Sequence, residues 1–169
     1  MARAKRKAAR KTGARAKSAV QQDAIALLKA DHRQVEEWFE QFESTRSDAR
    51  KQSLAQKVCQ ALKVHTQIEE EIFYPAAREA LDEEDLLDEA VVEHATAKDL
   101  IAQILEMEPS AELYDAKVKV LGEYIEHHVQ EEEGEMFKLV KKSDMDLDGI
   151  GAELEERKQE LLEEEGVEE

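Results

Sequence analysis

The sequence has little of what a β-protein, a disulfide-rich protein or a membrane protein needs. Only 6 Gly and 2 Pro occur in 169 residues, and aromatic residues make up 5%, which argues against a sandwich or a barrel. The single Cys59 excludes an internal disulfide framework and is expected to pack as a small hydrophobe in a helix. No apolar run approaches the ~20 residues that span a bilayer, and no apolar signal region follows the basic start. We therefore expect an all-α, cytoplasmic protein without membrane contact.

Charge is abundant and unevenly distributed. The net charge is −17, yet residues 1–18 contain eight basic and no acidic residues, so the remainder carries 16 basic and 41 acidic residues. Residues 1–19 hold too few apolar side chains to fold and are predicted to be a disordered basic tail. Three roles stay open for it: a solubilising tail, a nuclear or organelle address, or a non-specific tether to nucleic acid through phosphate neutralisation. Without interleaved aromatics, base reading is not expected.

Apolar residues recur every three or four positions and predict four long helices, over residues 20–44, 48–80, 83–106 and 111–142. Pro75 is expected to kink or end the second helix, and Ser110 to cap the fourth. Long helices with short connections favour an up-down-up-down four-helix bundle over residues 20–142. The acidic extension 143–169 is expected to hold a short helix over residues 150–165, solvated or loosely docked.

Four of the five histidines occupy apolar positions, one on each predicted helix: His32, His65, His94 and His128. Two of them are followed four residues later, on the same face, by Glu69 and Glu132. Burying these groups without partners would be costly, and imidazole with carboxylate suits iron in a bundle core. The alternative is a set of separately satisfied core histidines with surface glutamates.

An internal duplication argues against that alternative. The stretches that begin at His65 and at His128 both place glutamates at the fourth and fifth following positions and an aromatic residue, Tyr74 or Phe137, at the ninth. Helix building alone does not require this repetition. We therefore interpret the two stretches as halves of one metal site.

The combination of Asp31-His32, His65-x-x-x-Glu69, Glu93-His94 and His128-x-x-x-Glu132, with the aromatics that follow, resembles the hemerythrin-like, HHE cation-binding domain over about residues 23–142. The resemblance implies a four-helix bundle with a non-haem di-iron centre. It implies four histidine ligands and two bridging carboxylates, which in this sequence are His32, His65, His94, His128, Glu69 and Glu132.

One position departs from the oxygen-carrying members of that family, which have a further histidine one turn after the third ligand. Lys98 stands there in this sequence. One iron would then have an open or water-filled position, which suits chemistry better than stable oxygen carriage. Lys98 is expected to extend to solvent rather than into the opening. Whether Glu70, Glu133 or His127 supplies a substitute ligand is left open, and Tyr124 is expected to pack between helices rather than to donate to the site.

The sequence thus favours a di-iron protein that handles O2, peroxide or nitric oxide, and it leaves open whether this is enzymatic turnover. Two alternatives are kept. One is a non-catalytic module for iron binding, sensing or storage. The other is a bundle that residues 1–18 tether to nucleic acid.

Overall fold

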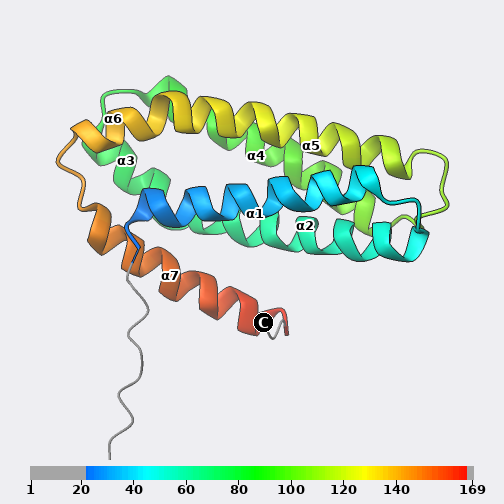
Figure 1. The fold of residues 1–169 in the computed structure, drawn as a ribbon. Helices are drawn as coiled ribbons and strands as arrows, with labels where there is room; N and C mark the ends of the chain where they lie inside the picture. The colour runs from blue at the N-terminus through cyan, green and yellow to red at the C-terminus, as the bar shows by residue number, and fades with distance from the viewer. Residues whose placement is uncertain (1–21, 167–169) are drawn as a thin grey trace, which may run out of the picture.

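The computed structural model describes residues 22–166, and every regular element within them is helical. Four rods run up and down beside one another, and a further helix lies along one side (Figure 1). This confirms the predicted all-α bundle. The predicted basic tail lies outside the described residues. Within the described part, no helix is both long enough and apolar enough to cross a bilayer.

The rods are made of the following elements. The first is α1 (Ala24–Ser44), and the second joins α2 (Asp48–Ile68), η1 (Glu69–Phe73) and α3 (Tyr74–Ala80). The third is α4 (Glu84–Leu105), and the fourth joins α5 (Tyr114–Glu131), η2 (Glu132–Met136) and α6 (Phe137–Lys142). The fifth helix is α7 (Leu147–Glu164).

Side-chain caps define the starts of α1, α2 and α7, and at α7 the Asp146 carboxylate accepts a hydrogen bond from the Gly149 N–H. The Asp23 carboxylate accepts a hydrogen bond from the Ala26 N–H at 2.8 Å, and the Ser47 hydroxyl accepts one from the Arg50 N–H at 3.3 Å. The prediction that Ser110 caps the fourth rod is wrong. Residues 111–113 are still in turns, with the Tyr114 N–H bonded to the Ala111 carbonyl, and α5 begins at the buried Tyr114.

Two π-helical turns interrupt the α-helices at equivalent places. The Tyr74 N–H donates to the Glu69 carbonyl, and the Phe137 N–H donates to the Glu132 carbonyl, each spanning five residues instead of four. Pro75 does not end the second rod, because the chain stays helical to Ala80. Since the second π turn has no proline after it, proline is not the common cause. What the two turns share is the repeated His-x-x-x-Glu sequence.

The apolar core is split into two clusters with the polar residues of interest between them. One cluster includes Leu28, Ile68 and Met136, and the other includes Val35, Leu62 and Ile125. His32 falls between Leu28 and Val35 along its rod, and the other three histidines are placed in the same way on theirs. A layer of histidine and glutamate therefore crosses the middle of the bundle.

The expectation of a solvated or loosely docked C-terminal helix is wrong. Leu154 and Leu161 of α7 are buried in the same cluster as Ala24 and Leu28 of α1. Gly151 permits this close approach, because a Cβ there would lie 2.5 Å from the Gln22 carbonyl oxygen and 2.8 Å from the Ala24 nitrogen. The acidic composition of this helix suggested solvent exposure, although Leu147, Leu154 and Leu161 recur every seven residues on one face.

Candidate metal centre

The six residues singled out from the sequence meet in one buried layer. Each rod supplies one histidine, and the second and fourth rods add a glutamate at the start of the π turn. All six residues are buried, and their exposed fractions range from 0% for Glu69 to 6% for His32. The residues that form the layer are His32, His65, Glu69, His94, His128 and Glu132.

The histidines form two pairs through their Nε2 atoms. His32 Nε2 lies 3.1 Å from His65 Nε2, and His94 Nε2 lies 3.2 Å from His128 Nε2. The Glu69 carboxylate spans the pairs, with Oε1 3.1 Å from His65 Nε2 and Oε2 3.2 Å from His94 Nε2. This geometry gives two groups of donor atoms with Glu69 common to both.

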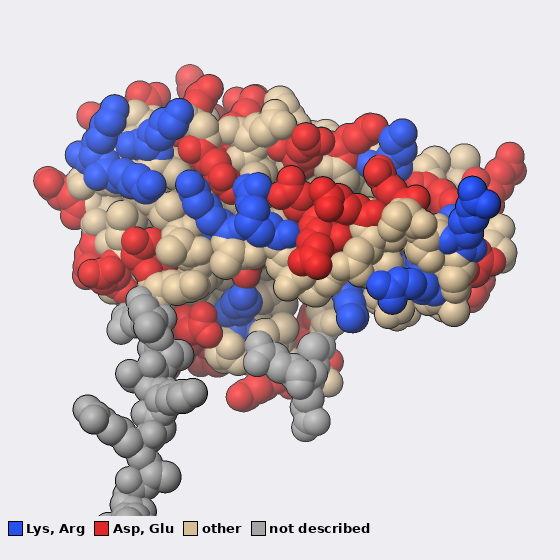
Figure 2. Space-filling model, viewed as in Figure 1, with Lys and Arg blue, Asp and Glu red and all other residues tan. Residues whose placement is uncertain are grey.

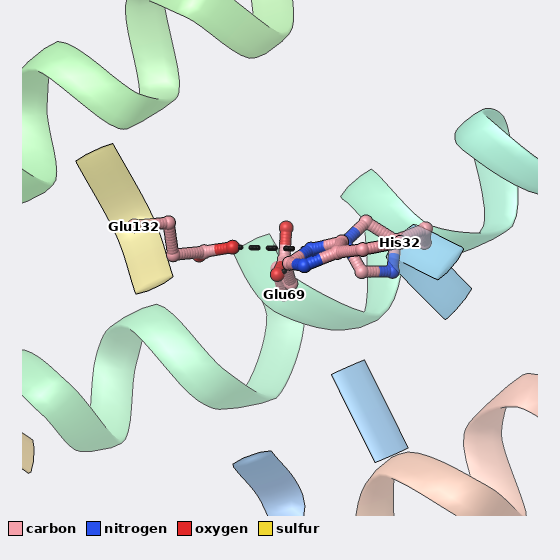
Figure 3. A group of neighbouring side chains, drawn as sticks. His32, Glu69 and Glu132 are labelled. Carbon is pink, nitrogen blue, oxygen red and sulfur yellow. Dashed lines mark hydrogen bonds and ion pairs between the residues drawn. The ribbon is translucent and has the colours of Figure 1, made fainter. Parts of the chain in front are cut away.

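The Glu132 carboxylate faces the same space from the opposite rod. Figure 3 shows it pointing toward His32 and Glu69, and its Oε2 lies 3.3 Å from His32 Nε2. The same oxygen is 4.0 Å from His128 Nε2. Glu132 is thus closer to the first histidine pair than to the second.

A carboxylate contacts the outward Nδ1 of every one of these histidines. Glu133 Oε1 lies 2.8 Å from His32 Nδ1, and Asp31 Oδ2 lies 3.3 Å from His65 Nδ1. Glu70 Oε1 lies 3.0 Å from His94 Nδ1, and Glu93 Oε2 lies 2.5 Å from His128 Nδ1. A carboxylate accepts but does not donate, so each Nδ1 carries a proton, and each ring in its neutral form directs the Nε2 lone pair inward.

Converging lone pairs fit a cation. Glu69 Oε1 and Glu132 Oε2 are buried and accept no hydrogen bond from any described residue, although each lies close to an imidazole nitrogen. Burial opposes ionisation of Glu69, but His65 and His94 outweigh it and hold the pKa of this carboxyl well below its usual range. For His65, burial likewise opposes protonation, but Glu69 and Asp31 raise its pKa well above the usual value, so a metal ion bound at His65 Nε2 would displace a proton. The layer therefore attracts positive charge and is able to bind metal.

A match to a known protein family identifies this bundle. Residues 23–140 match the model of the hemerythrin HHE cation binding domain. The chain belongs to this family. The match covers all four rods of the bundle and stops before α7.

Two individual proteins are also similar to it. A crystal structure of a hemerythrin HHE cation binding domain-containing protein from Mycobacterium kansasii superposes with a TM-score of 0.71 at 24% identity, covering 85% of this chain and 89% of that one, a likeness in fold. A protein of Nostoc sp. (strain PCC 7120 / SAG 25.82 / UTEX 2576) described as a DNA nickase is 27% identical over 115 residues, which are 68% of this chain. The match spans only 32% of the nickase.

Three of the four outer carboxylates of this hemerythrin-like domain also contact a Lys or Arg. Arg33 Nη2 donates to Glu133 Oε1 at 2.7 Å, and Lys158 Nζ of α7 donates to Asp31 Oδ1 at 2.5 Å. Lys98 does not enter the centre; its ammonium donates to both Glu70 oxygens at 2.7 Å. Glu70 and Glu133, which the sequence left open as substitute ligands, therefore lie behind His94 and His32.

The fourth outer carboxylate, Glu93, faces a surface histidine instead. His127 Nε2 lies 3.7 Å from Glu93 Oε1 and 3.4 Å from Glu131 Oε1, and the His127 side chain is 59% exposed. These three residues form a separate group near the surface. His127 is therefore not placed to complete the buried centre.

Tyr74 belongs to the centre and was missed as a site residue. Its hydroxyl oxygen lies 3.2 Å from His94 Nε2, 3.1 Å from Glu132 Oε1 and 3.4 Å from Glu69 Oε2. In an uninterrupted α-helix a residue nine positions after His65 would lie about 180° around the axis from it. The extra residue of the π turn shifts Tyr74 by about 100° toward the interior. The repeated aromatic at the ninth position was the available signal.

The two halves of the site differ in their aromatic residues. Phe137, the counterpart of Tyr74, stacks on the His32 ring with 6.1 Å between centroids and 5° between planes, and it offers no hydroxyl. Burial and the neighbouring Glu132 and Glu69 raise the pKa of the Tyr74 phenol well above its usual value. The His94–His128 side thus has a polar oxygen that the His32–His65 side lacks.

The cavity that is bordered by all four histidines is small. It measures about 10 Å³ and is also lined by apolar side chains including Val35, Leu62 and Ile125. This is about the space of one water molecule. This cavity therefore has room for a very small molecule and not for an organic substrate, although a separate cavity of about 470 Å³, lined mainly by residues of α1 and α5, also reaches His32.

Proposed function

We propose that this hemerythrin-like domain binds two non-haem iron ions and uses the ion on the His94–His128 side to react with O2, peroxide or nitric oxide. The six residues predicted from the sequence are the proposed protein ligands. His32, His65, Glu69 and Glu132 would hold one ion, and His94, His128 and Glu69 the other. Mixed imidazole and carboxylate donors are the set that iron favours in helical bundles.

The observation that carries this proposal is the position of the Glu69 carboxylate between the two histidine pairs. Its two oxygens approach one imidazole nitrogen from each pair, at 3.1 and 3.2 Å. A single fully buried carboxylate can thus serve both ions. A one-metal site would not require donors on both sides of this group.

The two ion positions differ in what surrounds them, and that difference supports reactivity at the second. Its histidine pair is accompanied by the Tyr74 hydroxyl, where the first pair has Phe137. Iron would supply reversible one-electron transfer to the bound oxidant. Tyr74 can provide an oxygen donor or a proton at its hydroxyl, and Val35, Leu62 and Ile125 limit the size of what enters. The cavity shared by the four histidines accommodates no larger substrate.

The test is anaerobic loading of the full chain with ferrous iron, followed by addition of O2 or peroxide. We expect two irons per chain, an absorption band of an oxygen-bridged ferric pair, and consumption of the oxidant. His65→Ala and His128→Ala should each lower the iron content, whereas His127→Ala, at the exposed neighbouring position, should leave it unchanged.

The outcomes separate the candidate roles. Two irons with a slow single response would favour the non-catalytic alternative of binding, sensing or storage. Fewer than one iron per chain, or unchanged iron content in both ligand variants, would refute the site. Loading by zinc or manganese alone would retain the site and change its chemistry.

A second proposal concerns nucleic acid as a partner. Residues 1–18 carry eight basic and no acidic residues, and one similar protein is described as a DNA nickase. The rest of the chain is strongly acidic, and Figure 2 shows acidic side chains over much of one face, with basic ones between them. We propose that any DNA contact is made by residues 1–18 through phosphates. Salt-dependent DNA binding that survives deletion of residues 1–18 would refute this.

A further inference from the structure

The helix α7 lies beyond the part of the chain that matches the family, yet it contacts the metal centre. The match ends at residue 140, and α7 spans Leu147–Glu164. One of its side chains, Lys158, contacts Asp31 on the first rod. The link is an ion pair between a lysine that is 26% exposed and a carboxylate that is 16% exposed, so it is partly shielded from water.

From Lys158 a continuous series of polar contacts leads inward. Lys158 Nζ lies 2.5 Å from Asp31 Oδ1, and the other Asp31 oxygen lies 3.3 Å from His65 Nδ1. His65 Nε2 in turn lies 3.1 Å from Glu69 Oε1, one of the buried oxygens without a hydrogen bond. Two contacts, from Lys158 to Asp31 and from Asp31 to His65, thus link Lys158 to a proposed metal ligand.

Of the four outer carboxylates, Asp31 makes the longest contact with its histidine. Its 3.3 Å contact with Nδ1 is longer than the 2.8, 3.0 and 2.5 Å contacts of Glu133, Glu70 and Glu93. A carboxylate with a long contact depends more on other partners to stay in place. The cation that supports it comes from outside the four rods, whereas Arg33 and Lys98 lie on the rods themselves.

We propose that Lys158 is a positioning residue of the metal centre and that it couples the docking of α7 to metal binding at the His32–His65 side. By holding Asp31 against His65 Nδ1, it keeps the His65 ring oriented with Nε2 toward the metal position. Because coupling is reciprocal, bound metal stabilises the docked α7 by the same factor by which docked α7 tightens metal binding. This inference rests on the proposed metal centre and not on any reaction with oxidants.

The structure offers a matched control, which is a second polar contact between the end of α7 and α2. The Glu165 carboxylate, just after α7, accepts hydrogen bonds from Lys63 at 2.8 Å and from Gln60 at 3.0 Å. This pair also fastens α7 to α2 but contacts no carboxylate behind a histidine. Lys63→Met therefore removes one contact of α7 without touching Asp31, and the buried leucines of α7 keep the helix docked. Lys158→Met removes a charge that faces Asp31 and keeps the aliphatic stem.

The experiment titrates Co²⁺ alone into the full-length chain under chelator competition and records the visible spectrum. We expect Lys158→Met to lower the affinity of one Co²⁺ equivalent about three- to tenfold and to change its spectrum, and Asp31→Asn to lower it about 10–100-fold. Lys158→Arg should restore both, and Lys63→Met should match the wild type. Hydrogen exchange in α7 should slow on Co²⁺ binding in the wild type but not in Lys158→Met.

Two results would overturn the inference. One is wild-type Co²⁺ affinity and spectrum in both Lys158→Met and Asp31→Asn. The other is an equal loss in Lys63→Met, which would show that only helix docking matters. The metal centre itself is judged separately, since a wild-type chain that binds no Co²⁺ would refute the proposed function.

Discussion

The role of each histidine and glutamate at this centre depends on which of its nitrogen or oxygen atoms is not already hydrogen-bonded. Carboxylates behind the four histidines hold protons on Nδ1, so the inward nitrogens and the Glu69 carboxylate present lone pairs to one another. That arrangement is unfavourable without a cation, and it is the same on both sides. The feature that differs between the sides is a hydroxyl, on Tyr74 and absent from Phe137.

Tyr74→Phe tests whether that hydroxyl matters. The ferric wild-type protein is expected to show a visible phenolate-to-iron absorption, because a bound cation favours loss of the phenol proton. The variant should lose this band, keep two irons, and lose about 1 kcal/mol of stability through the lost hydrogen bond to Glu132. Tyr124→Phe, at a half-buried tyrosine outside the histidine and glutamate layer, is the control. An unchanged spectrum in Tyr74→Phe would exclude Tyr74 as a ligand.

The sequence allowed all six converging residues to be predicted, because each lies on an apolar stripe and stripes face the core. It did not allow their neighbours to be assigned. Asp31 and Glu93 each contact the histidine of the following rod rather than the adjacent residue in sequence, and Glu70 and Glu133 contact histidines on the third and first rods. Such pairing depends on how far each rod is shifted along the bundle axis relative to its neighbours, which helical periodicity does not encode.

At the scale of elements, the two π turns place the site's side chains. An α-helix carried through Glu69 and Glu132 would turn the following aromatics away from the bundle interior. A constant 100° per residue turns Glu69 and Glu132 toward the core, where both are buried, but it does not turn the aromatics five residues later toward the core. The docking of α7 was missed for a different reason, since a single small residue, Gly151, decides how near that helix can approach.

Gly151→Ala tests the close approach of α7. Its Cβ would lie within 2.8 Å of backbone atoms of residues 22–24, which cannot move as a side chain can. We expect a loss of about 1–3 kcal/mol in the free energy of unfolding, measured with urea. Gly134→Ala is the matched control, because nothing lies within 4 Å of a Cβ there, and it should change stability by less than about 1 kcal/mol. Equal stability of the two variants would contradict the close approach.

The end of α7 should loosen in acid. The hydrogen bond from Lys63 holds the pKa of Glu165 below its ordinary 4.5, against a smaller opposing effect of burial, and Gln60 adds to the lowering. A carboxyl with a depressed folded pKa stabilises the docked helix above the unfolded pKa and loses this as pH falls through the folded value. The protection of the last turn against hydrogen exchange, relative to the intrinsic exchange rate at each pH, should therefore decrease below pH 4.5, by no more than about 1 kcal/mol.

The control for this pH dependence is Glu165→Gln. Its protection against exchange in the last turn of α7 should be low at every pH, with no further loss in acid beyond that of the whole protein. A variant that keeps the wild-type pH profile would mean that another group controls the end of the helix.

At the scale of the whole molecule, the histidine layer separates the apolar core into two parts and draws donors from every rod. The four-rod architecture was predictable, since periodicity, length and short connections all agree. The position of the fifth helix was not, because its acidic composition suggested solvent exposure. The consequence of this architecture is that one polar layer, and not continuous apolar packing, joins the middle of the four rods.

Metal removal should therefore destabilise the fold as a whole and not one helix. Metal bound by residues of all four rods favours the native chain over the unfolded one by about 2.7 kcal/mol per site at a free concentration 100 times the Kd. Thermal unfolding of the chelator-treated and Co²⁺-loaded protein should shift as a single transition, with α4 and α5 protected as much as α1 and α2. His65→Ala should lose most of the shift, because it removes a donor beside the shared Glu69. A metal-dependent shift confined to two rods would show that the layer does not act as one site.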